Sequence, residues 1–311
     1  MIARRALLLA APAFAQAERP IRFIVPFPPG GGTDVVSREL AQRIQAALGW
    51  VIVIENRPGA GGNIGLDAVA RAAPDGLTVG LGQTANLAIN PALYPAMPFD
   101  PLRDFTLIST VAQQPLVLVT ATRAPWTDVA GVVAAAQRAP LTTGHPGNGT
   151  VGHLTGELFA RAAGVELTAV PYRGAGGVVA DLLARRIDLY FANPPSVRGL
   201  IEGGELRALA VTAPGRVAAF AAVPTFAESG YPGFVAQNWT GLVAPARLPP
   251  PLLAGWNGAV RAALAMPEMR RQLAQDGSEP MGGTAEEFRA FLDGEHARWG
   301  QLVRQARIEL S

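Results

Sequence analysis

The fold class of this chain follows from the stretch IRFIVPFPPGGGTDVVSRELAQRIQAAL, residues 21–48. The apolar, β-branched run over 21–26 predicts a buried strand, and the prolines and glycines over 27–32 predict a tight loop. From Thr33, a capping residue, an apolar side chain returns about once per helical turn as far as Leu48, which predicts a helix. A strand, a glycine-rich loop and a helix in this order indicate one unit of an α/β protein.

The same order of elements recurs along the rest of the chain. Further strands are predicted at 51–54, 78–82, 116–120, 141–143, 167–170, 187–191 and 206–212. Further helices are predicted at 64–72, 126–138, 151–163, 177–185, 249–264, 267–275 and 284–307. Strands that alternate with helices at this spacing predict parallel sheets with helices packed on their faces.

The length of the chain and the repeated pattern predict two α/β lobes, the second inserted into the first. Lobe 1 is expected to comprise residues 18–118 and 236–311, and lobe 2 residues 119–235. The extended runs 116–120 and 235–244 would carry the chain from one lobe to the other. A single large sheet is the alternative, because periodicity alone does not decide which strands pair.

The 26 basic residues of the chain are all arginine, and it contains no lysine and no cysteine. The absence of lysine excludes a P-loop nucleotide site and a Schiff base with a pyridoxal cofactor. The absence of cysteine excludes thiol nucleophiles, thiolate-bound zinc, iron–sulfur clusters and disulfides. A formal net charge of +2 without a dense basic run also argues against a nucleic-acid partner. We therefore expect neither a cofactor nor a metal.

The N-terminal segment has the composition of an export signal. Two arginines at positions 4–5 precede a short apolar run over 6–13, and cleavage sites of the A-x-A type end at Ala15 and Ala17. We therefore expect a signal peptide over residues 1–17 and a mature protein in the periplasm. The apolar run is too short to span a membrane, and the paired arginines leave general secretion and twin-arginine export both open.

Two glycine-rich loops are the candidate ligand sites. The loops 27–34 and 144–150 each join a strand to a helix N-terminus, where backbone N–H groups and the helix dipole favour an anion. Two such loops, one in each lobe, could face each other across a cleft and hold a small anion between them. For either loop alone, a plain tight turn is the alternative. Asp34, in the first helical turn, is expected to stabilise the helix end.

Catalytic and metal sites are not indicated. The glycines over 59–65 lack the spacing of a dinucleotide-binding loop, because Ile64 stands where the third glycine belongs. His145 and His153 lie eight residues apart without an acidic cluster, and no G-x-S-x-G elbow occurs. His153 is expected to hold the second loop or to pack. The sequence thus offers no good nucleophile or acid–base pair for an enzyme.

Longer motifs of the chain are similar to those of a known family. Among them are PFPPGGGTD at 26–34, ENRPGAGGNIG at 55–65, PGNGT at 146–150, VPYRG at 170–174 and VPTFAESG at 223–230. On these motifs, which follow one another along nearly all of the mature chain, the sequence resembles the Bug-type periplasmic solute-binding receptors of the tripartite tricarboxylate transporter family.

The resemblance implies a type II-like periplasmic binding fold, with two lobes and a hinge. It implies that a ligand carboxylate lies between the two loops, held largely by backbone amides and ordered water. Carried over to this sequence, the contact residues are Phe27, Pro28, Gly30, Gly31, Thr33, Gly147, Asn148, Gly149 and Thr150, with His153 behind the second loop. Variable positions that would select the ligand are expected at Asn63, Gln83, Thr84 and Asn193.

The resemblance also implies the function and the partners. A receptor of this family captures a small carboxylate, such as an organic acid, and passes it to integral-membrane transporter subunits without chemical change; we expect this chain to act as a monomer. A ligand-sensing role toward a membrane partner and an enzyme on the same fold are the alternatives. The ligand does not follow from the resemblance, because His145 stands where a small hydroxyl residue is common.

Overall fold

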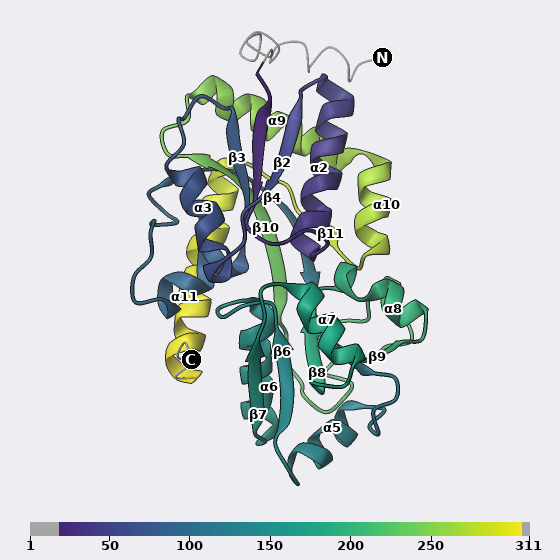
Figure 1. Cartoon of the computed structure of the whole chain (residues 1–311). Coiled ribbons are helices and arrows are strands. Elements are labelled where there is room, and N and C mark those ends of the chain that lie inside the picture. The colour runs from purple at the N-terminus through teal and green to yellow at the C-terminus, as the bar shows by residue number, and fades with distance from the viewer. Residues whose placement is uncertain (1–18, 307–311) are drawn as a thin grey trace.

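The computed structural model describes residues 19–306. Two α/β lobes lie one beside the other, each built around its own sheet (Figure 1). The alternative of a single large sheet is therefore excluded. The expected export segment lies outside the described residues.

The sheet of lobe 1 has six strands in the order β11-β4-β10-β3-β1-β2. These strands are β1 (Ile21–Val25), β2 (Ile52–Asn56), β3 (Thr78–Gln83), β4 (Phe105–Pro115), β10 (Gln237–Pro245) and β11 (Glu279–Pro280). β1 pairs in parallel with β2 and β3, whereas β10 runs antiparallel between β3 and β4. In this sheet, the prediction of parallel strands is thus right for β1–β3 and wrong for β4, β10 and β11. The physical reason is that β4 leads out to lobe 2 and β10 returns from it, so these neighbours run in opposite directions.

The sheet of lobe 2 has five strands in the order β7-β6-β8-β5-β9. These strands are β5 (Val117–Ala121), β6 (Leu141–His145), β7 (Leu167–Pro171), β8 (Leu189–Ala192) and β9 (Leu206–Val211). β6 is parallel to β7 and β8, whereas β5 is antiparallel to β8 and β9. This sheet is mixed as well, because β5 enters it directly from lobe 1.

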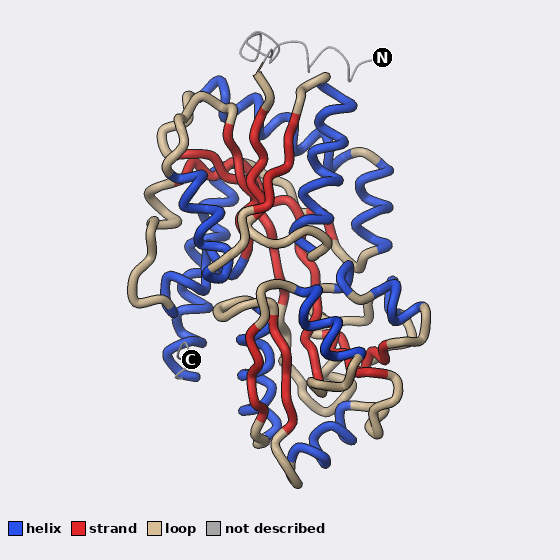
Figure 2. The backbone as a smooth tube through the Cα atoms, in the orientation of Figure 1, coloured by secondary structure: helices blue, strands red, loops and turns tan. Residues whose placement is uncertain are grey.

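Helices cover both faces of the sheets (Figure 2). Those of lobe 1 are α2 (Gly32–Leu48), α3 (Asn63–Ala70), α4 (Asn90–Leu93), α9 (Pro250–Ala265), α10 (Pro267–Gln275) and α11 (Ala285–Ala306). Those of lobe 2 are α5 (Val129–Ala136), α6 (Val151–Ala163), α7 (Ala175–Leu183) and α8 (Arg198–Glu202). Successive side chains of β1 enter opposite layers: Phe23 packs in the core beneath α2 and α9, and Ile24 in the core beneath α3.

The two connections between the lobes lie side by side. One runs from β4 into β5 at Leu116, and the other enters β10 after Ala236. The fully buried Thr212 joins them: its Oγ1 accepts a hydrogen bond from Leu116 N at 2.8 Å and donates one to Ala236 O at 2.6 Å. The chain therefore leaves lobe 1 and returns to it at almost the same place. The exact lobe boundaries given above stay a prediction.

Most predicted strands and helices overlap the observed ones, but β4 is absent from the prediction. Its burial explains the omission, because polar side chains of β4 lie inside the protein. Ser109 and Thr110 are 0% and 3% exposed. Their hydroxyls donate to the carbonyls of Gly283 and Gly282, which satisfies them without water. Buried polar residues break the apolar pattern on which strand prediction depends.

Candidate functional site

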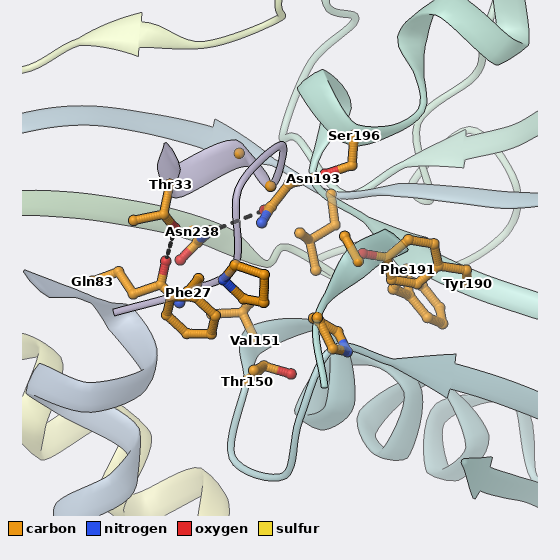
Figure 3. Close-up of a pocket in the computed structure, with 18 residues that line it drawn as sticks. Phe27, Thr33, Gln83, Thr150, Val151, Tyr190, Phe191, Asn193, Ser196 and Asn238 are labelled. Carbon is orange, nitrogen blue, oxygen red and sulfur yellow. Dashed lines mark hydrogen bonds between the residues drawn. The ribbon is translucent and has the colours of Figure 1, made fainter. Parts of the chain in front are cut away.

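A cavity lies between the lobes, at the carboxyl ends of β1, β3, β6 and β8, the place where α/β sheets bind ligands. Its lining residues are Phe27, Pro28, Gly31, Gly32, Thr33, Gln83, Leu116, Pro146, Thr150, Val151, Gly152, Gly174, Ala175, Tyr190, Phe191, Asn193, Ser196 and Asn238 (Figure 3). We term it the inner cavity. The space between its walls, open solvent at its mouth included, is about 500 Å³.

Three helices begin at the wall of the inner cavity: α2 at Gly32, α6 at Val151 and α7 at Ala175. The first N–H groups of a helix have no partner within the helix, and the helix dipole places partial positive charge there. Neither α2 nor α7 has a side-chain N-cap. In α6, Thr150 Oγ1 accepts from His153 N at 3.4 Å, so the first two amides of that helix stay available. The cavity wall therefore offers backbone donors from both lobes.

Asp34 organises the first loop and does not line the inner cavity. Its carboxylate accepts hydrogen bonds from Gly30 N at 3.0 Å, from Arg38 Nε at 2.9 Å and from Asn56 Nδ2 at 2.8 Å. Burial opposes ionisation of this carboxyl, but the hydrogen bonds from Arg38, Asn56 and Gly30 outweigh it and hold its pKa below the ordinary value. Asn56 also donates to Phe27 O at 2.9 Å, which fixes the loop at its other end. The role expected for Asp34 at the helix end agrees with these contacts.

The second loop, residues 144–150, is held by hydrogen bonds to the first turn of α6, the helix that follows it. Gly149 N donates to His153 Nδ1 at 3.3 Å, so this amide is engaged within the loop. Thr150 Oγ1 donates to Gly147 O at 2.7 Å. On its outer side Gly149 meets lobe 1, because a Cβ built there would lie 2.2 Å from Oδ1 of Asn90. The loop itself thus makes contact between the lobes, and the start of α6 faces the inner cavity.

Two histidines pack behind this loop. The rings of His145 and His153 stack with their centroids 4.3 Å apart. The pKa of each imidazole is lowered to about 4, mainly by burial, and for His153 the neighbouring His145 contributes to this shift. Both rings are therefore neutral at pH 7. Both rings support the loop by packing, and His153 also accepts the Gly149 hydrogen bond. Neither ring brings a charge to the cavity.

The side chains around the inner cavity are uncharged. Thr33 Oγ1 donates to Gln83 Oε1, and Asn238 Nδ2 donates to Asn193 Oδ1 at 3.2 Å (Figure 3). Among the residues that line it in the described part of the chain, none is Asp, Glu, Arg or His. An anion in this cavity would therefore be met by helix N-termini and neutral polar groups.

An outer cleft continues from the inner cavity and shares Phe27, Pro28 and Pro146 with it. It is further lined by Pro58, Gly59, Ala60, Gly61, Gly62, Ile64, Tyr94, Gly147, Asn148, Pro171, Tyr172 and Arg173. The lobes touch here, since Tyr94 OH donates to Asn148 O at 3.1 Å. Elsewhere between the lobes, Arg198 Nη1 of α8 pairs with Asp276 of lobe 1 at 3.1 Å. The lobes are closed on each other.

The predicted site residues fall into three groups. Those that line the inner cavity are Phe27, Pro28, Gly31, Thr33, Gln83, Thr150 and Asn193. Those that line the outer cleft without reaching the inner cavity are Gly147 and Asn148. Those that line neither are Gly30, Asn63, Thr84, Gly149 and His153. Two of the last group are buried supports: Asn63 Oδ1 accepts from Asn90 at 2.8 Å, and Thr84 Oγ1 accepts from Trp239 N at 2.8 Å.

Sequence reasoning missed several residues of the inner cavity, above all Asn238 and Ser196, and the helix start at Gly174-Ala175. The signal for Gly174 was present in the sequence. This glycine belongs to a loop between a strand and a helix, as do the glycines of the two loops that were predicted. Its φ of 124° is one that glycine favours. No comparable sequence signal marks Asn238, which lies within a strand.

Among residues 19–306, no group of three or more His, Cys, Asp or Glu side chains is placed to hold a metal ion. Within the same range, no helix combines the length and the hydropathy that a membrane span requires.

Comparison with known proteins identifies the family. The model described as tripartite tricarboxylate transporter family receptor matches residues 36–308. This chain belongs to that receptor family. The protein BugT of Bordetella pertussis is 38% identical over 307 residues, which cover 97% of this chain and 94% of the relative. The resemblance to Bug-type receptors is thereby confirmed.

Solved structures of receptors confirm the two-lobed periplasmic binding fold. The periplasmic binding protein BugD is 32% identical, with a TM-score of 0.90 over 94% of this chain and 99% of the other. The R. palustris protein Rpa4515, solved with adipate, is 36% identical, with a TM-score of 0.91 over 94% of this chain and 98% of the other. The function of a solute-binding receptor for a tripartite transporter follows from the family, which is a family of receptors and not of enzymes.

Proposed function

We propose that the receptor holds the carboxylate of a small organic acid in the inner cavity, at the starts of α2, α6 and α7. The observation that carries the proposal is the convergence of these three helix N-termini, from both lobes, on a cavity without charged side chains. A helix N-terminus provides oriented N–H donors and partial positive charge, which suit a carboxylate. The adipate bound to Rpa4515 supports an organic acid as the ligand.

Fixed amides explain why no arginine is needed in the cavity. A guanidinium buried there without a ligand would carry a large desolvation cost, whereas backbone amides are already in place and are neutral. Contacts from both lobes also mean that ligand binding favours the closed arrangement over an open one. We further propose that the receptor works as a monomer, returns its ligand unchanged and docks on the membrane subunits of its transporter.

The carboxylate proposal predicts a thermal shift. In a panel of mono-, di- and tricarboxylates, amino acids and aromatic acids, at least one carboxylate should raise the melting temperature. At a hundredfold excess over its dissociation constant, binding adds about 2.7 kcal/mol, which corresponds to a rise of about 5–10 °C. Differential scanning fluorimetry measures this shift, and mass spectrometry of molecules released from the purified protein extends the panel. A protein that responds to no carboxylate in either experiment would contradict the proposal.

A matched variant tests whether amides or an arginine hold the anion. Arg173 lines the outer cleft, directly before the start of α7, and is the arginine nearest in sequence to a cavity residue. Arg173→Ala should keep most of the thermal shift, because the guanidinium lies outside the inner cavity. Loss of the shift in this variant, with an unchanged melting temperature of the free protein, would place the anion in the outer cleft and overturn the amide model.

We also propose export to the periplasm with cleavage after Ala15 or Ala17. The charged start, the short apolar run and the two A-x-A sites support this proposal. N-terminal sequencing of the protein from a periplasmic extract should begin at Gln16 or Glu18. Recovery of the chain with Met1 intact, from the cytoplasmic fraction, would contradict it.

A further inference from the structure

The first turn of α2 carries an acidic side chain directly beside the wall of the inner cavity. Gly32 and Thr33 line the cavity, and the buried Asp34 follows them in the chain. Burial opposes the ionisation of Asp34, but its hydrogen bonds keep the pKa of the carboxyl below the ordinary value, so it is charged at pH 7. A negative charge at this place uses the same helix end as a ligand carboxylate. An uncompensated Asp34 would therefore oppose the binding of an anion.

Arg38 supplies the compensating charge. Its Nε donates to Asp34 Oδ2 at 2.9 Å, across one turn of α2. The side chain of Arg38 is 50% exposed, whereas that of Asp34 is 3% exposed. Neither residue lines the inner cavity or the outer cleft. The guanidinium therefore neutralises a buried charge next to the cavity and lies outside the ligand site itself.

The carboxylate of Asp34 cannot simply be replaced by a neutral amide, because both of its oxygens accept hydrogen bonds. Oδ2 accepts from Gly30 N at 3.0 Å as well as from Arg38, and Oδ1 accepts from Asn56 Nδ2 at 2.8 Å. Asn56 Nδ2 also donates to Phe27 O at 2.9 Å, and Asn56 Oδ1 accepts from Arg38 Nη2 at 3.1 Å. An asparagine in place of Asp34 would have only one acceptor oxygen. The shape of the loop thus requires an acid, and the acid brings a charge.

From these contacts we infer that Arg38 is a positioning residue for ligand binding: it cancels the charge of Asp34 and so leaves the positive end of α2 free for the ligand carboxylate. The inference rests on the proposed function, since it assumes a carboxylate at the start of α2. It gives Arg38 an electrostatic part in affinity, although Arg38 lines neither cavity. An ion pair that only stabilised the helix would leave the affinity unchanged.

Two substitutions at Arg38 separate its charge from its hydrogen bond. Lysine keeps the charge and a donor, whereas glutamine keeps a donor without the charge. Isothermal titration calorimetry of the purified protein uses acetate, succinate, adipate, malate, citrate and benzoate as probes, and continues with the acid that binds the wild type most tightly. At low salt, Arg38→Gln should bind this acid about two- to fivefold more weakly, the usual size of a charge effect at a helix end. Arg38→Lys should bind it like the wild type.

Arg43→Gln is the matched control. Arg43 Nε donates to Glu39 Oε1 at 2.7 Å, so this pair lies on the same helix at the same spacing of four residues. Its loss removes an ion pair of the same kind but leaves no unpaired charge in the first turn of α2. The affinity of this variant should therefore stay that of the wild type. Melting temperatures of the free proteins report the loss of stability separately from the loss of affinity.

Salt and a second substitution identify the effect as electrostatic. The difference in affinity between the wild type and Arg38→Gln should shrink as salt is raised from about 20 mM to about 500 mM, because dissolved ions screen the unpaired charge. The double variant Asp34→Asn/Arg38→Gln has no charge at either position, and it should recover part of the affinity that Arg38→Gln loses. An effect of equal size at both salt concentrations would contradict the inference.

The outcomes distinguish this inference from the proposed function. If Arg38→Gln binds the acid like the wild type, or if Arg43→Gln or Arg38→Lys loses as much affinity, the inference is wrong while the carboxylate site stands. If none of the probe acids binds the wild type, both are overturned. Should Arg38→Gln fail to fold, Arg38→His carries the same test, because its imidazole loses its charge as the pH rises from 6 to 8.5. Its affinity should fall over this range more than that of the wild type, and an equal pH dependence would overturn the inference.

Discussion

Gly149→Val is expected to abolish ligand binding and to leave a protein that still unfolds cooperatively. Gly149 belongs to lobe 2, and a Cβ there would lie 2.2 Å from Asn90 Oδ1 and 3.2 Å from Tyr94 Cε2, both in lobe 1. A valine therefore wedges the lobes apart at the outer cleft, and the helix starts of the two lobes no longer reach one ligand. Small-angle scattering should give a larger radius of gyration than for the wild type, and the best acid of the carboxylate panel should no longer raise the melting temperature.

Gly164→Val is the matched control for this variant. The backbone at Gly149 has a φ of 77°, and that at Gly164 a φ of 63°, so both substitutions carry the strain of a left-handed residue, about 1–2 kcal/mol. Gly164 ends α6, and a Cβ at this position would have no neighbouring atom within 4 Å. The control should melt lower than the wild type and still respond to the acid. An equal response in both variants would mean that the contact at Gly149 does not govern closure.

The second large effect is a loss of stability in acid caused by His145 and His153. Their pKa values in the folded protein are about 4, whereas a free histidine has a pKa near 6.5. Between these two values the unfolded chain binds more protons than the folded one, so folding stability is complete above about pH 6.5 and is lost as the pH falls toward 4. From pH 7 to pH 4.5 the loss is about 2 kcal/mol for each histidine, because each pKa unit corresponds to about 1.4 kcal/mol.

Melting temperatures measured across this pH range test the effect. The wild type should melt about 10 °C lower at pH 4.5 than at pH 7 on account of the two histidines. The double variant His145→Leu/His153→Leu should lose that part of the pH dependence, since leucine does not titrate. Each protein is compared with itself at pH 7, so the packing cost of the substitutions cancels. Because His153 Nδ1 accepts from Gly149 N, acid should also weaken ligand binding in the wild type. A double variant with the full wild-type pH dependence would contradict the assignment.

How much of the fold the sequence predicts depends on how local its signals are. The strand–loop–helix order around Thr33 is a local pattern, and its repetition along the chain was enough to predict the α/β class. Two lobes were expected from the length and the repetition, but a single large sheet stayed open as the alternative. The pairing of β4 with β10 is not local, because it joins residues 105–115 to 237–245. Buried hydroxyls in β4 interrupt the apolar pattern that would have marked this strand, whereas β10 was expected as an extended run over 235–244 without its partner.

The same distinction applies to the candidate site. Backbone sites on glycine loops can be predicted from the sequence, because glycines and helix-capping residues mark them. Residues such as Gly31 and Thr150 were predicted on that basis. A side-chain contact such as Asn238 with Asn193 joins residues 45 positions apart and belonging to different lobes. An asparagine inside an apolar strand could equally have been a buried support, as Asn63 and Thr84 are. Only the three-dimensional arrangement of the lobes shows whether such an asparagine lines the cavity or is a buried support.

The meeting of both lobe connections at Thr212 has a consequence for how such receptors diversify. The backbone groups of Leu116 and Ala236 lie within reach of one hydroxyl, so the segment between them enters and leaves its host at a single junction. One recombination event that exchanges this segment between relatives would replace Ser196 and the starts of α6 and α7 together. The loop at 27–34 and the hydrophobic layers beneath α2 would be untouched. A single exchange of this segment would thus transfer ligand specificity from one receptor to another while the rest of lobe 1 keeps its sequence.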